Sequence, residues 1–311
     1  MLPEESLRLT AFFGSLGLLY LCAGLLGIRL VIQRRWGRVP LGGERVLRRI
    51  VFSLAAAGPL CWAYAALVEP YWLSVTHVAV SVENWQGPPL RIVHISDLHS
   101  ESEPRLEGRL PAAVRAERPD LILFTGDALN SPEGLAVFKS CLAELASIAP
   151  TLVVRGNWDV WYWAELDLFG ATGALELANS SVVRTIRGNE VWIGGLDVGG
   201  EAALGHLVQA APAGALRVLL HHYPDEVLRA SQAGVDLYLA GHTHGGQVAL
   251  PFYGALVTLS KFGKRFESGL QRVGRTWIYV TRGIGMEGGA APRVRFFARP
   301  ELAVIEVRRQ G

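Results

Sequence analysis

Hydrophobic and polar positions divide the chain into a strongly apolar N-terminal part and a longer part of short alternating runs. The stretch from Leu9 to Ile28 carries no charge over roughly 20 residues, long enough to cross the hydrocarbon core of a bilayer as a helix. A second stretch, from Ile50 to Val68, is about as long but alanine-rich and interrupted by Pro59, which membrane helices tolerate. The pattern predicts a membrane anchor over residues 1–70, with one or two transmembrane helices at about 9–28 and 50–68.

A cleavable signal peptide is the competing interpretation of the first apolar stretch. The leader MLPEESLR is acidic rather than basic, and no small-x-small cleavage site follows the apolar core. Cys22 also lacks the small preceding residues of a lipoprotein signal. We therefore expect the anchor to be retained. Tyr71 and Trp72 follow the second stretch, where interfacial aromatic residues are typical.

Residues 71–311 contain short β-rich runs separated by Gly, Pro and Asp, with helical patterns between several of them. The expected strands cover residues 77–83, 90–96, 120–126, 151–156, 181–187, 190–196, 216–222, 236–242, 276–282 and 301–308. Gly188 and Asn189 have the turn chemistry of a β-hairpin. Strands that alternate with helices and then form hairpins predict one layered α/β domain, with mixed β-sheets flanked by helices.

Composition and charge indicate how the chain would be oriented in a membrane. Half of the residues are hydrophobic and the mean hydropathy is +0.26, an excess concentrated in the anchor. Between the apolar stretches, seven arginines and one glutamate give residues 29–49 a net charge of +6. Since the whole chain is at +2, the remainder carries −4, which argues against a nucleic-acid partner. The arginines are typical of a cytoplasmic loop, so the large domain lies outside the cytoplasm if both stretches span and inside if only the first does.

Potential metal ligands follow nearly every expected strand at its carboxyl end, the edge where α/β sheets bind ligands. The candidates are Asp97, His99, Asp127, Asn157, His222, His242 and His244. Asp-x-His and His-x-His pairs on extended backbone can direct both side chains at one cation. Carboxylate, imidazole and amide groups together suit Mn, Fe or Zn better than Ca. Seven ligands are too many for one ion with an open position and fit two ions bridged by a carboxylate.

Each of these elements alone is weak evidence. A single histidine at a strand end is more often a structural residue, and Gly126, Gly156 and Asn157 could belong to ordinary turns. The combined order and placement carry the inference, because each candidate follows an apolar strand on a glycine or a short turn. Two metal ions about 3.5–4 Å apart clamp the attacking and leaving oxygens of phosphoryl transfer.

The ordered motifs DLH, GD, GNWD, HHYPD and GHTH resemble those of the calcineurin-like metallophosphoesterase family, over roughly Leu90 to Val307. The chain is also similar to the family's membrane-anchored bacterial branch, which implies a location in a bacterial inner membrane. The resemblance implies one metal ion held by Asp97, His99, Asp127 and His244, and another held by Asp127, Asn157, His222 and His242. Asp127 would bridge the two ions, and Asp127, Asn157 and His242 are the expected catalytic residues. Manganese is the expected metal, with iron or zinc as alternatives.

The choice of His222 over His221 follows the family pattern, in which the ligand stands two residues before a proline, here Pro224. His221 is then expected to support a metal ligand from outside the centre, to pack in the core, or to contact the substrate. Arg155 and Trp158 are the other expected substrate contacts.

Trp158 stands where the family pattern Gly-Asn-His-Asp has a histidine, which is thought to protonate the leaving oxygen or to stabilise phosphate. General acid catalysis is worth roughly 10²–10⁴-fold and matters most for a poor leaving group. Its loss favours pyrophosphate linkages or esters of acidic alcohols over simple alkyl phosphoesters. Trp158, Trp161, Tyr162 and Trp163 are either core packing or an apolar wall for a lipid or a base.

The leading hypothesis is a membrane-anchored, dinuclear metal-dependent hydrolase of phosphoester or pyrophosphate bonds. A lipid-linked substrate such as UDP-2,3-diacylglucosamine is one candidate, and an undecaprenyl-type lipid or a phospholipid is another. The alternative is a membrane receptor or scaffold that keeps the metal-binding fold with little turnover. A nuclease is disfavoured by the charge balance.

Overall fold

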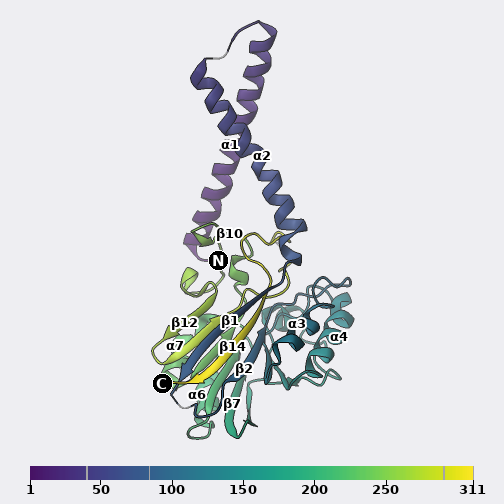
Figure 1. Cartoon of the computed structure of the whole chain (residues 1–311), viewed down its shortest axis with the longest axis vertical. Coiled ribbons are helices and arrows are strands. Elements are labelled where there is room, and N and C mark those ends of the chain that lie inside the picture. The colour runs from purple at the N-terminus through teal and green to yellow at the C-terminus, as the bar shows by residue number, and fades with distance from the viewer. Residues whose placement is uncertain (40, 84, 290, 311) are drawn as a thin grey trace.

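A long helical hairpin projects from one end of an α/β domain (Figure 1). The computed structural model describes residues 1–39, 41–83, 85–289 and 291–310. The hairpin consists of α1 (Pro3–Arg35) and α2 (Gly42–Leu67). In α1, acidic residues occupy the first turn and Arg34 and Arg35 the last, which complements the helix dipole. Both helices are long and apolar enough to cross a membrane by length and composition.

α1 extends beyond the apolar stretch at 9–28 on both sides, whereas α2 starts before the stretch at 50–68 and ends at Leu67. α1 continues through polar turns at both ends, because helical hydrogen bonding does not stop where hydrophobicity does. At the far tip the Arg29 guanidinium pairs with Glu44 at 3.0 Å, and the Gln33 amide donates to the same carboxylate at 2.9 Å. Midway, the Tyr20 hydroxyl donates to the Ala55 carbonyl at 3.0 Å. These contacts hold the two helices together.

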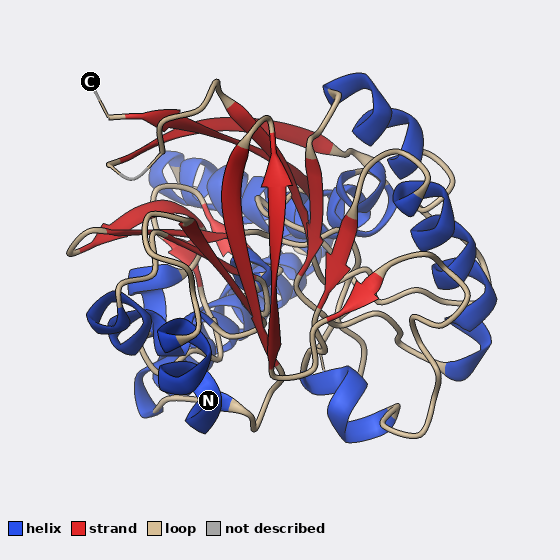
Figure 2. Ribbon diagram, turned by 90° about the horizontal axis from the view of Figure 1, so that it is seen from below, coloured by secondary structure: helices blue, strands red, loops and turns tan. Residues whose placement is uncertain are grey.

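Two mixed β-sheets, each of six strands among the described residues, form the domain (Figure 2). In order, the first sheet contains β1 (Ser74–Val82), β14 (Glu301–Arg309), β2 (Leu90–Ile95), β3 (Leu121–Phe124), β4 (Thr151–Val153) and β5 (Leu175–Glu176). The second contains β12 (Gly269–Val273), β13 (Thr276–Val280), β9 (Leu237–Ala240), β8 (Leu216–His221), β7 (Asn189–Leu196) and β6 (Ser180–Ile186). A short pair, β10 (Ala249–Leu250) and β11 (Gly254–Ala255), lies apart.

Apolar side chains of the two sheets pack against each other and form the central core. The outer face of the first sheet is covered by α3 (Leu110–Glu117) and α4 (Leu135–Ala146). The outer face of the second is covered by α6 (Leu204–Gln209) and α7 (Val227–Ala233). Because both faces of each sheet are covered, the central strands are apolar on both sides. The mixed sheets flanked by helices confirm the predicted fold class.

The β6–β7 hairpin was expected at Gly188–Asn189, and the structure shifts its turn by one residue. Arg187 and Gly188 both have positive φ, at 50° and 80°, as a two-residue type I′ turn requires. Asn189 is the first residue of β7, and its side-chain amide donates to the Arg187 carbonyl at 3.0 Å.

Strand direction places the carboxyl ends of the central strands beside the hairpin. β1 begins at Ser74, directly after the 3₁₀ turn η1 (Glu69–Tyr71) that follows α2. β14 runs parallel to β1, with Glu301 opposite Ser74, and β2 runs antiparallel to β14. β3 and β4 are parallel to β2. We call the edge where β2, β3 and β4 end the hairpin-facing edge of the domain (Figure 1).

Candidate metal centre

The turns that follow β2, β3 and β9 carry most of the predicted ligands, and their backbone is unusual. Positive φ angles occur at Asp97 (52°), His99 (44°), Asp127 (59°), His242 (69°) and His244 (51°). A non-glycine residue in this left-handed region costs about 1–2 kcal/mol. Such conformations gather at functional sites, where the surrounding structure holds them in place. Here four of these residues, Asp97, His99, Asp127 and His244, bring ligand atoms from three strand ends close together.

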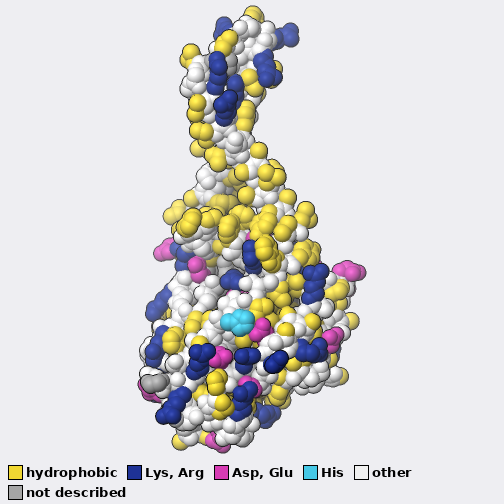
Figure 3. All heavy atoms as spheres, viewed as in Figure 1, with side chains coloured by type: hydrophobic (Ala, Val, Ile, Leu, Met, Phe, Trp, Pro, Cys, Tyr) yellow, Lys and Arg dark blue, Asp and Glu magenta, His cyan; other side chains and the backbone are white. Residues whose placement is uncertain are grey.

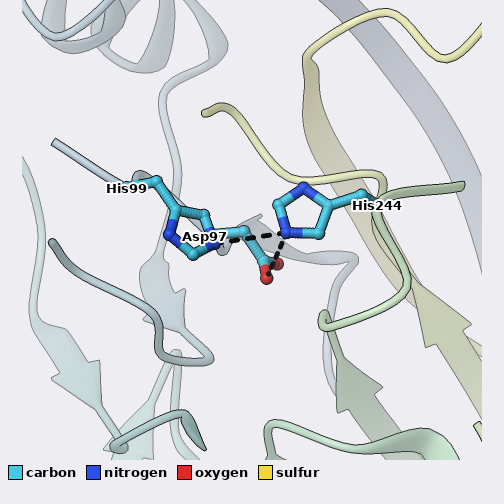
Figure 4. A group of neighbouring side chains, drawn as sticks. All are labelled: Asp97, His99 and His244. Atoms are coloured by element: carbon cyan, nitrogen blue, oxygen red, sulfur yellow. Dashed lines mark hydrogen bonds and ion pairs between the residues drawn. The ribbon is translucent and has the colours of Figure 1, made fainter. Parts of the chain in front are cut away.

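Asp97, His99 and His244 form one group of potential ligands (Figure 4). The Nε2 atoms of His99 and His244 lie 3.2 Å apart, and His244 Nε2 lies 3.3 Å from an Asp97 carboxylate oxygen. All three side chains are buried. Two imidazole nitrogens that face each other beside a buried carboxylate are the arrangement that a shared cation stabilises.

Asp97, Asp127 and His222 form a second group next to the first. His222 Nε2 lies 3.3 Å from Asp127 Oδ2 and 4.0 Å from Asp97 Oδ1. Asp127 Oδ2 also lies 3.5 Å from His99 Nε2 in the first group. A carboxylate oxygen of Asp127 therefore faces imidazoles of both groups, and Asp97 is a member of both groups.

Asn157 and His242, the two remaining predicted ligands, lie beside these groups, and His242 belongs to neither of them. Asn157 is the first residue of α5 (Asn157–Tyr162), and its buried side-chain oxygen has no hydrogen-bond donor. A buried amide oxygen without a partner is costly, and a cation would satisfy it. The His242 ring packs against the rings of His222 and Tyr223, with centroids 5.2 and 4.3 Å away, and its Nε2 faces the Leu259 carbonyl at 3.4 Å.

Electrostatics also favour a cation at this point. Burial raises the pKa of Asp97 to about 7, and the neighbouring Asp127 carboxylate adds to the rise. Burial opposes protonation of His222, but Asp127 overcomes this effect and raises the His222 pKa to about 9. Without a metal ion, Asp97 and His222 therefore bind protons more readily than they would in water. Divalent cations would replace them, because metal binding and protonation compete for the same atoms.

The histidine rings are fixed by groups on the side away from the centre. His222 Nδ1 lies 2.7 Å from the Thr125 carbonyl, and the buried Arg295 guanidinium contacts His244 Nδ1 at 3.1 Å. Arg295 also donates to the carbonyls of Arg282 and Ala298 at 2.7 and 3.0 Å. These contacts leave both Nε2 atoms directed at the carboxylates. Arg295 was not anticipated from the sequence, since nothing local marks it.

Asp159 joins two ligand-bearing turns. It belongs to the GNWD motif, but no role was predicted for it. Its carboxylate accepts hydrogen bonds from the backbone N–H groups of Asp127, Ala128 and Gly156, at 2.8, 2.9 and 2.9 Å. The turns touch so closely that a Cβ on Gly156 would lie 2.1 Å from an Asp127 carboxylate oxygen. Only glycine fits there.

Trp158 lies at the rim of the centre. Its backbone N–H donates to Asp127 Oδ1 at 2.9 Å, and its ring meets the His99 ring edge-on at 5.3 Å. Its indole N–H faces the half-buried Glu287 carboxylate at 3.4 Å. Burial, and then Asp127, raise the pKa of Glu287. Of the other aromatic residues, Trp163 packs on the core, whereas Trp161 and Tyr162 are exposed.

Arg155 and His221, both expected as substrate contacts, have other partners here. The Arg155 guanidinium pairs with Glu176 at 2.7 Å and donates to carbonyls of the turn at residues 163–166. His221 is buried on the opposite side of β8 from His222. Its Nδ1 lies 3.1 Å from the Leu196 carbonyl and its Nε2 lies 3.6 Å from Glu201.

The fold and the paired ligand groups define a metal-dependent phosphoesterase with a site suited to two ions. A family model described as calcineurin-like phosphoesterase matches residues 90–246, which include all seven predicted ligands, and the chain belongs to this family. This confirms the resemblance inferred from the motifs.

Three relatives illustrate the similarity. The uncharacterized metallophosphoesterase YkuE of Bacillus subtilis is 30% identical, over 83% of this chain and 95% of the relative. The phosphodiesterase YaeI of Escherichia coli is 31% identical, over 79% of this chain and 92% of the relative. The UDP-2,3-diacylglucosamine pyrophosphatase LpxG of Chlamydia muridarum is 23% identical, over 81% and 94%.

Proposed function

We propose that this protein is a membrane-anchored hydrolase of phosphoester or pyrophosphate bonds that uses two divalent metal ions. The residues that would hold these ions are Asp97, His99, Asp127, His222 and His244, which form the two ligand groups, and Asn157 and His242 beside them. Asp127 is proposed as the ligand that both ions would share. Manganese suits this mixed oxygen and nitrogen set, as do iron and zinc. Such a pair supplies Lewis acidity and an acidified water. Asp127, Asn157 and His242 are the proposed catalytic residues.

The residues around the centre favour a substrate whose leaving group needs no proton. Trp158 has no proton to donate to an oxygen anion at neutral pH, and its ring covers His99 on the rim. A departing phosphate is a stable anion, whereas a departing alkoxide requires protonation. Pyrophosphate linkages and esters of acidic alcohols are therefore the preferred substrates.

The hairpin supports an anchor over residues 1–70 and a catalytic domain over residues 71–311. The start of α1 and the end of α2 both lie at the domain, and the arginine-rich turn lies at the opposite tip (Figure 1). The positive-inside rule then assigns the tip to the cytoplasm and the catalytic domain to the outer side of a bacterial inner membrane.

A lipid-linked substrate follows from where the centre lies. The proposed ligands lie at the hairpin-facing edge. If the hairpin crosses the membrane, this edge of the domain is the one closest to the phosphate groups of the lipids. The relative named a UDP-2,3-diacylglucosamine pyrophosphatase supports a lipid that carries a pyrophosphate. The outward topology favours an undecaprenyl-type lipid or a phospholipid over a cytoplasmic nucleotide lipid.

The main observation behind this proposal is the cluster of Asp97, Asp127 and His222. The His222 Nε2 atom lies within 4.0 Å of a carboxylate oxygen of each aspartate. It is tested with the full chain in detergent and Mn²⁺, assayed on an aryl phosphodiester, a pyrophosphate and a lipid pyrophosphate. We expect hydrolysis by the wild type and by the exposed control Asp167→Asn, and loss of at least about 10²-fold in Asp127→Asn. Absence of hydrolysis on all three substrates would overturn the proposal.

The alternative is a receptor or scaffold that binds metal without turnover, and Trp158 is the observation that favours it. In that case Asp127→Asn would alter metal content but leave binding of a membrane partner unchanged. The intact ligand set argues for the enzyme, because a buried site with strained backbone is costly to keep.

A further inference from the structure

The length of α2 determines how deep the domain lies relative to a membrane that the hairpin crosses. Between Arg49 and Glu69 the chain carries no charge over about 19 residues, which as a helix span roughly 28 Å. The hydrocarbon core is about 30 Å thick, and helix tilt shortens the span further. No apolar length is left over on the domain side. Glu69 therefore lies at the membrane boundary.

Two buried glutamates attach loops of the domain to the ends of the hairpin at this depth. Glu69 accepts hydrogen bonds from the backbone N–H groups of Phe297 and Ala298, at 3.1 and 2.7 Å. Glu5 accepts from the backbone N–H groups of Thr258 and Leu259, at 2.8 and 3.3 Å. Buried carboxylates that each hold two backbone donors leave these loops little freedom to move away from the hairpin.

Exposed aromatic side chains surround the foot of the hairpin. Tyr71, Trp72, Phe252, Tyr253 and Phe297 form this group, which we call the aromatic collar. Phe252 is fully exposed at the tip of the β10–β11 turn, and the others are about half exposed. Figure 1 places β10 beside the start of α1, and Figure 3 shows apolar side chains gathered below the hairpin.

Cations accompany two rings of the collar. The Arg299 guanidinium lies 3.6 Å from the centre of the Trp72 ring, and the Lys264 ammonium lies 4.0 Å from that of Tyr253. Aromatic rings next to cations are typical of the membrane interface, where rings contact acyl chains and cations contact phosphates.

The opposite edge of the domain has a different surface. Its loops, at residues 85–89, 118–120, 187–188, 213–215 and 274–275, contribute none of the exposed large apolar side chains among the described residues. Figure 3 shows basic and acidic side chains toward this end of the view. The exposed aromatic surface is therefore confined to the hairpin-facing edge, where a second membrane contact would form.

We propose that the aromatic collar enters the boundary between headgroups and acyl chains, so that the domain rests on the bilayer with its metal-bearing edge facing the lipid. The occupant of this surface is the lipid bilayer, because the collar lies at the foot of a hairpin that is long and apolar enough to cross a membrane. The proposal rests on the hairpin crossing the membrane and goes beyond the proposed hydrolysis. It implies that a lipid phosphate reaches the centre at headgroup depth.

Fluorescence quenching tests the depth of the collar without turnover. Phe252→Cys is labelled with bimane in the full chain, after Cys22 and Cys61 are changed to Ala; Cys141 is buried. Glu190→Cys, exposed at the far edge, is the matched control. The labelled proteins are reconstituted into phosphatidylcholine–phosphatidylglycerol vesicles whose acyl chains carry bromine near the glycerol.

We expect the label at position 252 to lose most of its emission in brominated vesicles and the label at position 190 to lose none. An equal bromine-dependent loss of emission at positions 252 and 190 would overturn the proposal. So would emission at position 252 that depends on protein density but not on bromine, since a second copy would then cover the collar. Repeating the measurement in an Asp127→Asn background separates this result from any failure of hydrolysis, because quenching needs no activity.

A double variant, Phe252→Ser with Phe297→Ser, gives an independent readout. Neither residue contacts the metal centre, so hydrolysis of a soluble aryl phosphodiester should remain at the wild-type rate. Hydrolysis of the same lipid pyrophosphate should fall in vesicles but not in detergent micelles, where substrate and enzyme mix freely. An equal rate in vesicles for the variant and the wild type would also overturn the proposal.

Discussion

Replacing Asp159 with asparagine tests whether this residue holds the two central turns of the metal centre together. One carboxylate oxygen accepts the N–H groups of Asp127 and Gly156, and the other accepts that of Ala128. Asparagine can keep the first two bonds through its single oxygen. Its amide group then faces the Ala128 N–H, so one buried donor is left opposite another.

The cost follows from these contacts. A hydrogen bond to a charged acceptor contributes about 1.5–3 kcal/mol, and an unsatisfied buried donor costs a similar amount. We therefore expect the free energy of unfolding to fall by at least about 2 kcal/mol. For a domain of this size that is a drop of roughly 4–8 °C in the thermal midpoint. Since the same turns carry Asp127 and Asn157, metal affinity should fall by about 10–100-fold.

The assay compares thermal unfolding, metal content and activity of the full chain in detergent. Asp167→Asn is the matched control, because Asp167 also accepts a backbone N–H, that of Gly170 at 2.7 Å, but its side chain is 73% exposed. Its substitution should change stability by no more than about 0.5 kcal/mol. Activity of Asp159→Asn should recover at high Mn²⁺ if its role is positioning. Wild-type stability and metal affinity in Asp159→Asn would refute the reasoning.

Three further predictions concern the same centre. Trp158→His should raise hydrolysis of alkyl phosphodiesters by up to about 10²-fold and leave pyrophosphate hydrolysis unchanged, because only the former needs a proton donor; an unchanged ratio of rates would count against this. Gly156→Ala should abolish metal binding, measured by elemental analysis, because the added Cβ would lie 2.1 Å from an Asp127 carboxylate oxygen. The control Gly205→Ala should bind metal normally, because open space surrounds that position. In the metal-free protein, burial opposes protonation of His222, but the Asp127 carboxylate raises the His222 pKa to about 9. Protons and metal ions compete for this imidazole, so the apparent metal affinity measured by calorimetric titration should increase with pH up to about 9. A pH-independent affinity would contradict this.

The candidate ligands could be predicted from the sequence because each of them follows an apolar stretch at its carboxyl end. Asp97 and Asp127 lie together because β2 and β3 are parallel neighbours in one sheet, whereas His222 reaches them from β8 of the second sheet. The roles of Asp159 and Arg295 were not readable. Asp159 acts through backbone N–H groups, and Arg295 acts through the His244 ring and backbone carbonyls. These partners come together only after distant segments have packed.

Residue type alone was enough to identify the candidate metal ligands, their order after the strands, and the two apolar stretches that precede them. That the edge with the candidate ligands faces the hairpin depends on tertiary packing. Hydrophobic periodicity is the same for parallel and antiparallel strands, so it does not specify which end of β2 lies near the anchor. That orientation depends on β14, which pairs with β1 and β2 from the other end of the chain and places Glu301 beside Ser74.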